Sequence, residues 1–297
     1  TNDNYLKLFN LKSPLPLQND VLESFIKLNL SHERYDLTTS MQMYERLKGS
    51  NSDRYSYALP NYDLVKNFNL ENIDGSFNFN STGSNTLNNT NILSTTMSND
   101  LNYTSLNYFL DNGIKSNFEV SLKNINTMGK NNPMYKNTPQ SELASAYFYN
   151  ASLPLTKKND RSFNTLEPKL SLRFSPHDMK NNSGGSRRIE INNIFASNRL
   201  ALGDSFEAGE SVTLGINFKK EKINITEEIT QIEEYIDFKL ASVFRLSEEK
   251  NIPIATTLNK KTSNIFGKFK FKPIKNISFD YDFSLTNDLN IIEHQTI

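Results

Sequence analysis

The feature that most constrains the fold of this chain is an alternation of apolar and polar residues with a period of two. The alternation recurs in segments of about ten residues, the length of a tilted strand that crosses a bilayer. Because successive side chains of a β-strand point to opposite faces, each segment predicts a strand with one apolar and one polar face. The clearest segment has apolar residues at Ile277, Phe279, Tyr281, Phe283 and Leu285, with polar residues between them.

The same alternation is found along much of the chain. Residues 265–272 alternate in this way just before the clearest segment, and residues 273–276 supply a short turn, so the two segments predict a hairpin. Taken together, the segments predict an all-β fold of roughly a dozen meandering antiparallel strands. The other alternating segments are 118–123, 143–153, 166–174, 212–219 and 236–244.

Two classes of antiparallel fold produce this alternation. In a soluble sandwich the apolar faces of two sheets meet, whereas in a membrane barrel the apolar face meets lipid and the polar face lines a lumen. Strands near ten residues and 20 Phe and 13 Tyr spread over many segments favour the membrane. We therefore predict part of an antiparallel transmembrane β-barrel, and a soluble β-sandwich or adhesin stays open as an alternative.

The connections between the predicted strands differ in length. Residues 273–276 form a short turn that we expect on the periplasmic side, and residues 80–91, 124–140 and 248–261 are expected as outer loops. Residues 80–91 are also compatible with a linker between two domains. For residues 226–246 we expect a turn near Glu227 followed by a strand, with a short helix as the alternative.

Composition limits the possible functions. Lys plus Arg and Asp plus Glu are both 33, so no excess of basic charge indicates binding to nucleic acid. Cysteine is absent, which excludes disulfides, thiolate metal sites and a cysteine nucleophile within these 297 residues. The chain opens at Thr1 without a charged and apolar leader, and we expect it to be a fragment of a longer protein.

The sequence contains no recognisable catalytic constellation. The three histidines, His32, His177 and His294, are far apart, and no Gly-x-Ser-x-Gly motif occurs. Adjacent carboxylates at 233–234 and 248–249 would point to opposite faces of a strand and could not share a proton. We therefore predict no catalytic residue, no metal ligand and no cofactor, and do not expect an enzyme.

Residues 166–215 contain Glu167 and Pro168 and, further on, a passage from Asn193 to Gly209 that includes Asn198 and Arg199. This part of the chain resembles the barrel domain of the LptD family of lipopolysaccharide-assembly proteins, also called OstA or Imp. In that family an acidic residue and a proline open one strand, and a later passage rich in Asn, Gly and charged residues joins two others. The hairpin at 267–285 and a strand start near residue 53 resemble the same family. The residues that carry the resemblance are Glu167, Pro168, Asn193, Phe195, Asn198, Arg199, Gly203, Asp204, Glu207 and Gly209, together with Asp53, Arg54, Tyr55 and Pro60.

The passage from Asn193 to Gly209 also has a physical interpretation of its own. Amide, guanidinium and carboxylate groups gather around a turn in which Gly203 and Gly209 can take conformations that other residues avoid. We expect a polar network that braces the barrel wall, with Arg199 paired in a bidentate fashion to Asp204 or Glu207. The alternative is that these are ordinary loop residues.

The resemblance implies transport of lipopolysaccharide at the outer membrane of a Gram-negative cell, not a reaction. It implies a barrel plugged by an LptE-like lipoprotein, supplied with lipopolysaccharide by an LptA-like periplasmic bridge, and surrounded by outer-membrane lipid. It further implies that residues 1–297 are part of a single barrel domain, with the N-terminal jellyroll, the final strands and the lateral gate outside this segment. The family's disulfides are not visible here, and a generic outer-membrane porin or receptor barrel is the main alternative.

Overall fold

The chain folds almost entirely into antiparallel β-strands. A computed structural model describes residues 21–46, 54–68, 73–89, 91–225, 230–274, 276–289 and 292–296. Within them the strands form one sheet in the order β1-β2-β3-β4-β5-β7-β8-β10-β11-β12-β13-β14-β15, with β6 paired to β7 and β9 to β10. The prediction of an all-β, meandering antiparallel fold is confirmed.

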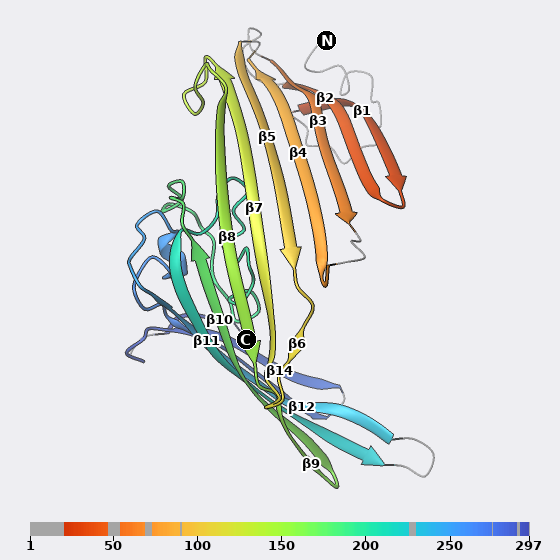
Figure 1. Ribbon diagram of the computed structural model, residues 1–297, viewed down its shortest axis with the longest axis vertical. Coiled ribbons are helices and arrows are strands. Elements are labelled where there is room, and N and C mark those ends of the chain that lie inside the picture. The colour runs from red at the N-terminus through yellow and green to blue at the C-terminus, as the bar shows by residue number, and fades with distance from the viewer. Residues whose placement is uncertain are drawn as a thin grey trace, which may run out of the picture. The chain divides into compact units, whose positions relative to one another are not determined.

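The elements have the following bounds, and most are labelled in Figure 1. They are β1 (Val21–His32), β2 (Tyr35–Arg46), β3 (Tyr55–Phe68), β4 (Ser76–Asn88), β5 (Ile92–Thr104), β6 (Tyr108–Phe109), β7 (Lys115–Lys130), β8 (Gln140–Ser152), β9 (Leu155–Asn159), β10 (Ser162–Ser175), β11 (Gly209–Ile225), β12 (Thr230–Arg245), the 3-10 helix η2 (Ile254–Thr256), β13 (Ile265–Ile274), β14 (Ile277–Leu285) and β15 (Ile292–Thr296).

The chain divides into two compact units, which are described separately. The first unit comprises Thr1–Asn72, Ser76–Asn102 and Leu122–Leu143, and the second comprises Ile73–Gly75, Tyr103–Ser121 and Ala144–Ile297. The helix η2 is a single short turn. Among the described residues, no helix is both long enough and apolar enough to cross a membrane.

In the first unit, one predicted outer loop is instead largely strand, and another is shorter than predicted. Residues 80–88 belong to β4, and only a short turn separates β4 from β5, so the prediction of a loop or linker at 80–91 is wrong. Strand β7 continues to Lys130, which shortens the predicted loop at 124–140 to residues 131–139. Polar side chains mask these strands in the sequence, but they pair across the sheet, as in the bonds from Ser81 to Asn99 (2.7 Å) and from Ser84 to Asn61 (2.7 Å).

In the second unit the apolar face of the sheet is exposed and the polar face is buried. Apolar side chains that alternate along β10 and β11, such as Leu172, Phe174 and Leu214, are exposed. The polar residues between them, Ser171 and Arg173 among them, are buried. In a soluble sandwich the apolar face would be the buried one, so this distribution favours a sheet whose apolar face meets lipid.

The buried polar face of the second unit is covered by the chain itself. Figure 1 shows residues 176–208 as an irregular trace beside β10 and β11, the two strands that they connect. Apolar side chains from this segment form a core with residues of β12, β13 and the β12–β13 connection. That core contains Met179, Ile189, Ile191, Ile194, Leu200, Leu202, Ala208, Ala241, Val243, Ile252, Leu258 and Phe266, with Phe195 packed against it.

Long and short connections alternate in the second unit. Residues 176–208 and 246–264 join strands at one end of the sheet, whereas β13 and β14 are joined at the other end near residues 275–276. The predicted long connection at 248–261 is therefore confirmed as a connection. The turn predicted at 273–276 is shorter than expected, because β13 continues to Ile274, and Lys275 lies outside the described residues. The predicted turn near Glu227 lies outside the described residues, but the strand expected after it is confirmed as β12.

Glycines make room for aromatic rings on neighbouring strands. Gly267 on β13 is the cross-strand partner of Phe283 on β14, and a Cβ atom at Gly267 would lie 2.2 Å from the Phe283 ring. In the first unit Gly83 has the same relation to Tyr62, at 2.1 Å. An aromatic ring that covers a cross-strand glycine fills the space that the missing side chain leaves.

We predict that Gly267→Ala destabilises the protein by about 1–3 kcal/mol, because the added methyl group overlaps the Phe283 ring and forces it from its position. Urea unfolding of the full-length protein in detergent measures the change. Gly184→Ala is the matched control, since a Cβ atom there meets nothing within 4 Å. Equal stability of the two variants would contradict this packing.

Candidate functional site

The site is a cluster of buried charges where the 176–208 segment meets β10, β11 and β12. Glu207 lies at its centre, and three arginines surround it: Arg199 from the segment, Arg173 from β10 and Arg245 from β12. The side chains of Glu207, Arg199 and Arg245 are each only 1% exposed. Because a charge is costly to remove from water, such burial requires that its partners be correctly placed.

All three nitrogen atoms of the Arg199 guanidinium group donate hydrogen bonds. It donates to both carboxylate oxygens of Glu207, from Nε to Oε2 at 2.8 Å and from Nη2 to Oε1 at 2.5 Å. It also donates to the hydroxyls of Ser211 and Thr213 on β11, each at 3.0 Å, and to the carbonyl of Ile194 at 3.3 Å. One side chain thus fastens the segment to the polar face of β11, and its planar fork suits the bidentate contact.

The other two arginines bind the same segment from neighbouring strands. Arg245 donates from Nη1 to Glu207 Oε1 at 2.7 Å and from Nη2 to the carbonyl of Ala208. Arg173 donates to the carbonyl of Ala196 at 2.8 Å, and its guanidinium group lies 4.5 Å from the centre of the Phe148 ring. The cluster therefore connects β8, β10, β11 and β12 through one loop.

The ionisation of Glu207 follows from these contacts. Burial by itself raises the pKa of the Glu207 carboxyl. The charges of Arg199, Arg173 and Arg245, together with the hydrogen bond from Arg199, outweigh burial and lower the pKa from 4.5 to about 2. Glu207 is thus an anion throughout the ordinary pH range and can hold the arginines in place.

The structure decides between the two predicted partners of Arg199. Glu207 forms the bidentate pair, whereas Asp204 lies 3.5 Å from Lys180 with its side chain 54% exposed. The expectation for the two glycines holds for one of them. Gly209 has a φ of 79°, but Gly203 does not adopt a positive φ, and Ala201 takes the left-handed conformation in this turn instead, at 53°.

The two motif asparagines shape the backbone of the segment. Asn193 accepts a hydrogen bond from the Glu190 amide at 3.0 Å. Asn198 both donates to the carbonyl of Leu202 at 3.2 Å and accepts from its amide at 2.9 Å, which closes the turn that presents Arg199. Side-chain amides of this kind commonly stabilise turns.

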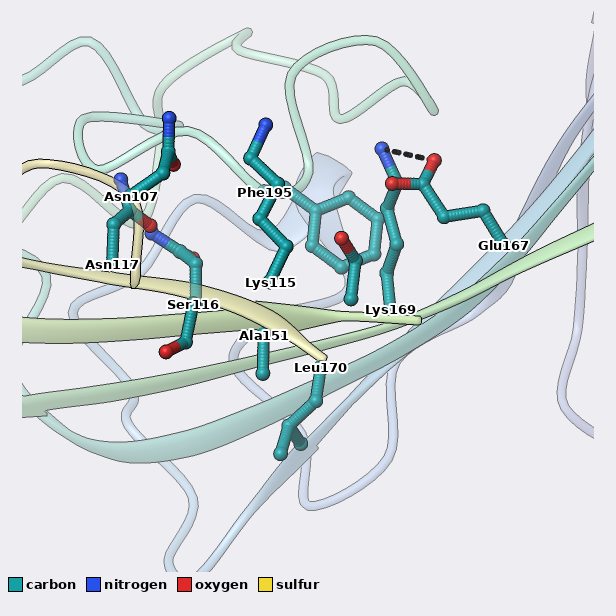
Figure 2. A pocket seen from close by; sticks show the side chains of 11 residues that line it. Asn107, Lys115, Ser116, Asn117, Ala151, Glu167, Lys169, Leu170 and Phe195 are labelled. Carbon is teal, nitrogen blue, oxygen red and sulfur yellow. Dashed lines mark ion pairs between the residues drawn. The ribbon is translucent and has the colours of Figure 1, made fainter. Parts of the chain in front are cut away.

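The ring of Phe195 lies directly on the sheet. A Cβ atom at Gly215 on β11 would come within 2.6 Å of the ring, so the glycine is what allows this contact. Phe195 also borders an open cavity of about 250 Å³ on the polar face. Figure 2 shows the ring between the side chains of Lys115 and Lys169, while Leu170 points to the other side of the strands.

Glu167 and Pro168 lie inside β10, not at its start. Glu167 borders the same cavity, where it pairs with Lys169 at 3.2 Å and accepts a hydrogen bond from Asn217 at 3.4 Å. Pro168 has Ile216 as its cross-strand partner, and its carbonyl accepts from the amide of Leu153. The structure therefore brings Glu167 and Phe195 to one cavity.

The motif near residue 53 belongs to the first unit. Asp53 lies outside the described residues. Arg54 donates to the carbonyl of Arg46 at 3.0 Å and lies 3.7 Å from Glu45, and Tyr55 donates to the same carboxylate at 3.3 Å. Pro60 lies in β3, where the pairing with both β2 and β4 shifts register. A proline is tolerated there because a bulge does not need its missing N–H.

The histidines form no metal site within the described residues, which hold no group of three His, Cys, Asp or Glu suited to a metal ion. His177 contacts the hydroxyl of Ser145 at 3.2 Å, and His32 stacks on Tyr35. The side chain of His294 lies outside the described part of the chain.

Arg173 and Arg245 are the functional residues that sequence reasoning missed as partners of Glu207. The alternation placed Arg173 on the polar face of β10, but nothing local indicated what it would meet. Arg245 continues the polar face that includes Asp237 and Lys239 on β12. A charged residue at a strand end, on the face that also carries small residues, was the available signal.

A sheet with an exposed apolar face, and a polar face that its own loop covers, defines the wall of a membrane β-barrel. Comparison with protein families identifies the kind. The family model for LptD, LPS transport system D, matches residues 1–297, and the chain belongs to this family. In a comparison with curated proteins, none matches the chain.

We predict that Arg199→Ala lowers the stability of the folded protein by about 3 kcal/mol, since it leaves Glu207 buried with fewer partners and frees the segment from β11. Unfolding in detergent and the yield of assembled barrel measure this loss, while strand content by circular dichroism should persist. Asp204→Asn removes only an exposed pair and should change stability by less than about 1 kcal/mol. A normal yield for Arg199→Ala would contradict the bracing role.

The lowered pKa of Glu207 predicts a dependence of stability on pH. A carboxyl whose pKa falls from 4.5 to about 2 on folding contributes stability above pH 4.5, and this contribution disappears as the pH falls toward 2. The stability advantage of the native protein over Glu207→Gln should therefore shrink across this window. Unfolding midpoints of both proteins, measured along a pH series from about 6 to about 3, test this. A constant difference would contradict it.

Proposed function

We propose that this chain supplies wall strands of the single outer-membrane barrel through which lipopolysaccharide reaches the cell surface. The observation that carries the proposal is the match to the LptD family over residues 1–297. Lipopolysaccharide transport at the outer membrane is the function of that family. The exposed apolar face and the covered polar face of the second unit support a position in a lipid bilayer.

The proposal includes two protein partners. An LptE-like lipoprotein would plug the barrel from within and contact its polar face, and an LptA-like periplasmic bridge would deliver the lipopolysaccharide. The polar face offers charged and amide groups for such contacts, among them Lys115, Glu167 and Asn150 around the cavity of Figure 2. A polar lumen surface suits a hydrophilic plug and the sugar portion of the substrate.

The cluster around Glu207 has a defined role in this proposal. The 176–208 segment covers the polar face near the end of the sheet that carries the long connections, which we place at the cell surface. By fixing the segment, the cluster keeps a set conformation on the lumen side of β10, β11 and β12. Glu167, Pro168 and the residues from Asn193 to Gly209 would thus act by positioning and not by chemistry.

Depletion of the full-length protein in its host tests the function. We expect loss of lipopolysaccharide from the cell surface and accumulation of precursor in the inner membrane, because the last transport step is blocked. Re-expression of the native protein or of Asp204→Asn should restore surface lipopolysaccharide, whereas Arg199→Ala should restore less, in proportion to its assembled barrel. Unchanged surface lipopolysaccharide after depletion would return the assignment to a generic porin or receptor barrel.

A further inference from the structure

The short-turn end of the second unit carries a cationic cavity on the face opposite the polar one. The cavity has a volume of about 460 Å³ and is lined by Arg161, Ser162, Lys220, Lys222, Ile223 and Tyr235. These residues come from β10, β11 and β12 and from the turn before β10. The amide of Ile223 donates to the carbonyl of Arg161 at 3.0 Å, which holds this turn against the end of β11.

The strand periodicity of β11 determines the face on which the lysines lie. Lys219 and Glu221 pair with each other at 2.7 Å, and Lys219 also approaches Glu234. Lys220 and Lys222 alternate with them and therefore share a face with Leu214, which is 47% exposed. The two lysines thus lie on the same face as the exposed apolar side chains, closer to the end of the strand.

A β-bulge directs Tyr235 toward the same lysines. The register of β11 and β12 passes from Lys220 opposite Ile236 to Glu221 opposite Glu234, so Tyr235 is the extra residue of the bulge. Bulges commonly redirect a side chain in this way. The ammonium group of Lys222 lies 3.7 Å from the centre of the Tyr235 ring, and that of Lys220 lies 5.9 Å from it.

Tyr235 also adjoins a group of aromatic rings. It meets Phe271 edge-on at a centroid distance of 5.2 Å, and Phe271 stacks against Phe269 and Phe279 at 6.5 Å each. Phe279 and Phe269 are exposed. Belts of exposed aromatic rings mark the level at which a barrel crosses from hydrocarbon to headgroups, so in the proposed membrane position the cationic cavity would lie at headgroup depth.

The charges of this region are mainly positive. Lys157 on β9 alternates on the same face, opposite Asn164, and joins Arg161, Lys220 and Lys222. Among the described residues, the nearby acids are Asp160, in the turn before β10, and Glu233, the cross-strand partner of Lys222. In the part of this region that the structure describes, four cations therefore lie near two carboxylates, next to a Ser hydroxyl and a Tyr side chain that can both donate hydrogen bonds.

We propose that this cavity binds the phosphate of an anionic glycerophospholipid from the leaflet that surrounds the short-turn end of the barrel. Lysine and arginine stems that extend from an apolar surface place their charges among headgroups, and such clusters attract anionic lipid. The inference rests on the membrane position given under the proposed function, but not on lipopolysaccharide transport. A bound headgroup would fix the ends of β10, β11 and β12 relative to the bilayer.

The test uses the full-length protein, purified with the proposed LptE-like lipoprotein, in nanodiscs of zwitterionic phosphatidylcholine that contain a small fraction of phosphatidylglycerol. Retention of labelled phosphatidylglycerol is compared for the native protein and the triple variant Arg161→Gln, Lys220→Gln and Lys222→Gln. Three lysines at the opposite end of the sheet, Lys250, Lys260 and Lys261, are all exposed, and their replacement by Gln is the control with the same change of charge.

We expect the triple variant to lose about tenfold or more of the apparent affinity for phosphatidylglycerol, while the control variant retains it. Equal retention by all three proteins would overturn the proposal. Stronger retention of lipid A than of phosphatidylglycerol through the same three residues would also overturn it, in favour of lipopolysaccharide phosphate, as would full displacement of the lipid by inorganic phosphate.

Two further measurements keep the result interpretable. Circular dichroism and the unfolding midpoint in detergent establish that the triple variant is folded, and Lys220→Gln alone supplies a milder variant if it is not. Surface lipopolysaccharide in cells is measured separately. If the triple variant loses lipid retention but transports lipopolysaccharide normally, the lipid site is supported independently of transport. If depletion leaves surface lipopolysaccharide unchanged but the native protein still retains the lipid, the lipid site holds and the transport function does not.

Discussion

A single buried carboxylate, Glu207, organises the second unit. It forms ion pairs with guanidinium groups from three places in the chain, and without it these positive charges would face each other in a site that excludes water. The neighbouring hydroxyls of Ser211 and Thr213 complete the hydrogen bonds of Arg199. Because each arginine also holds a strand or a loop carbonyl, the cluster converts an irregular segment into a fixed cover for the polar face of the sheet.

The cover explains how a sheet can have its polar residues inside. Small and polar side chains on β10 and β11 leave space that Ile194, Phe195 and the other apolar residues of the segment fill. On the opposite face, large apolar side chains are left exposed, which is costly in water and favourable in lipid. One face therefore suits lipid and the other suits contact with the chain's own segment. This difference is the physical link between the fold and membership in a family of outer-membrane transport proteins.

Long and short connections alternate along the chain, so the two ends of the second unit differ in structure. One end carries the long connections and the charge cluster, and the other carries tight turns, aromatic rings and a cationic cavity. A barrel in an asymmetric membrane meets a different surface at each end, so a difference in connection length and charge between the ends is the expected consequence. The proposed headgroup site and the covered lumen face are then separate features that one set of strands supports.

The sequence by itself determined the class of fold, because side-chain alternation is a local property of a strand and several separate segments between 118 and 285 display it. It also gave Glu207 as one of two candidate partners of Arg199, beside Asp204, since all three residues lie in one short passage. It failed at 80–91, where β4 is built from Ser, Asn and Thr that resemble a loop. Only the tertiary structure showed that Arg173 and Arg245 complete the cluster and that Asp204 does not, because those contacts depend on strand register and on the path of the 176–208 segment, which no local spacing encodes.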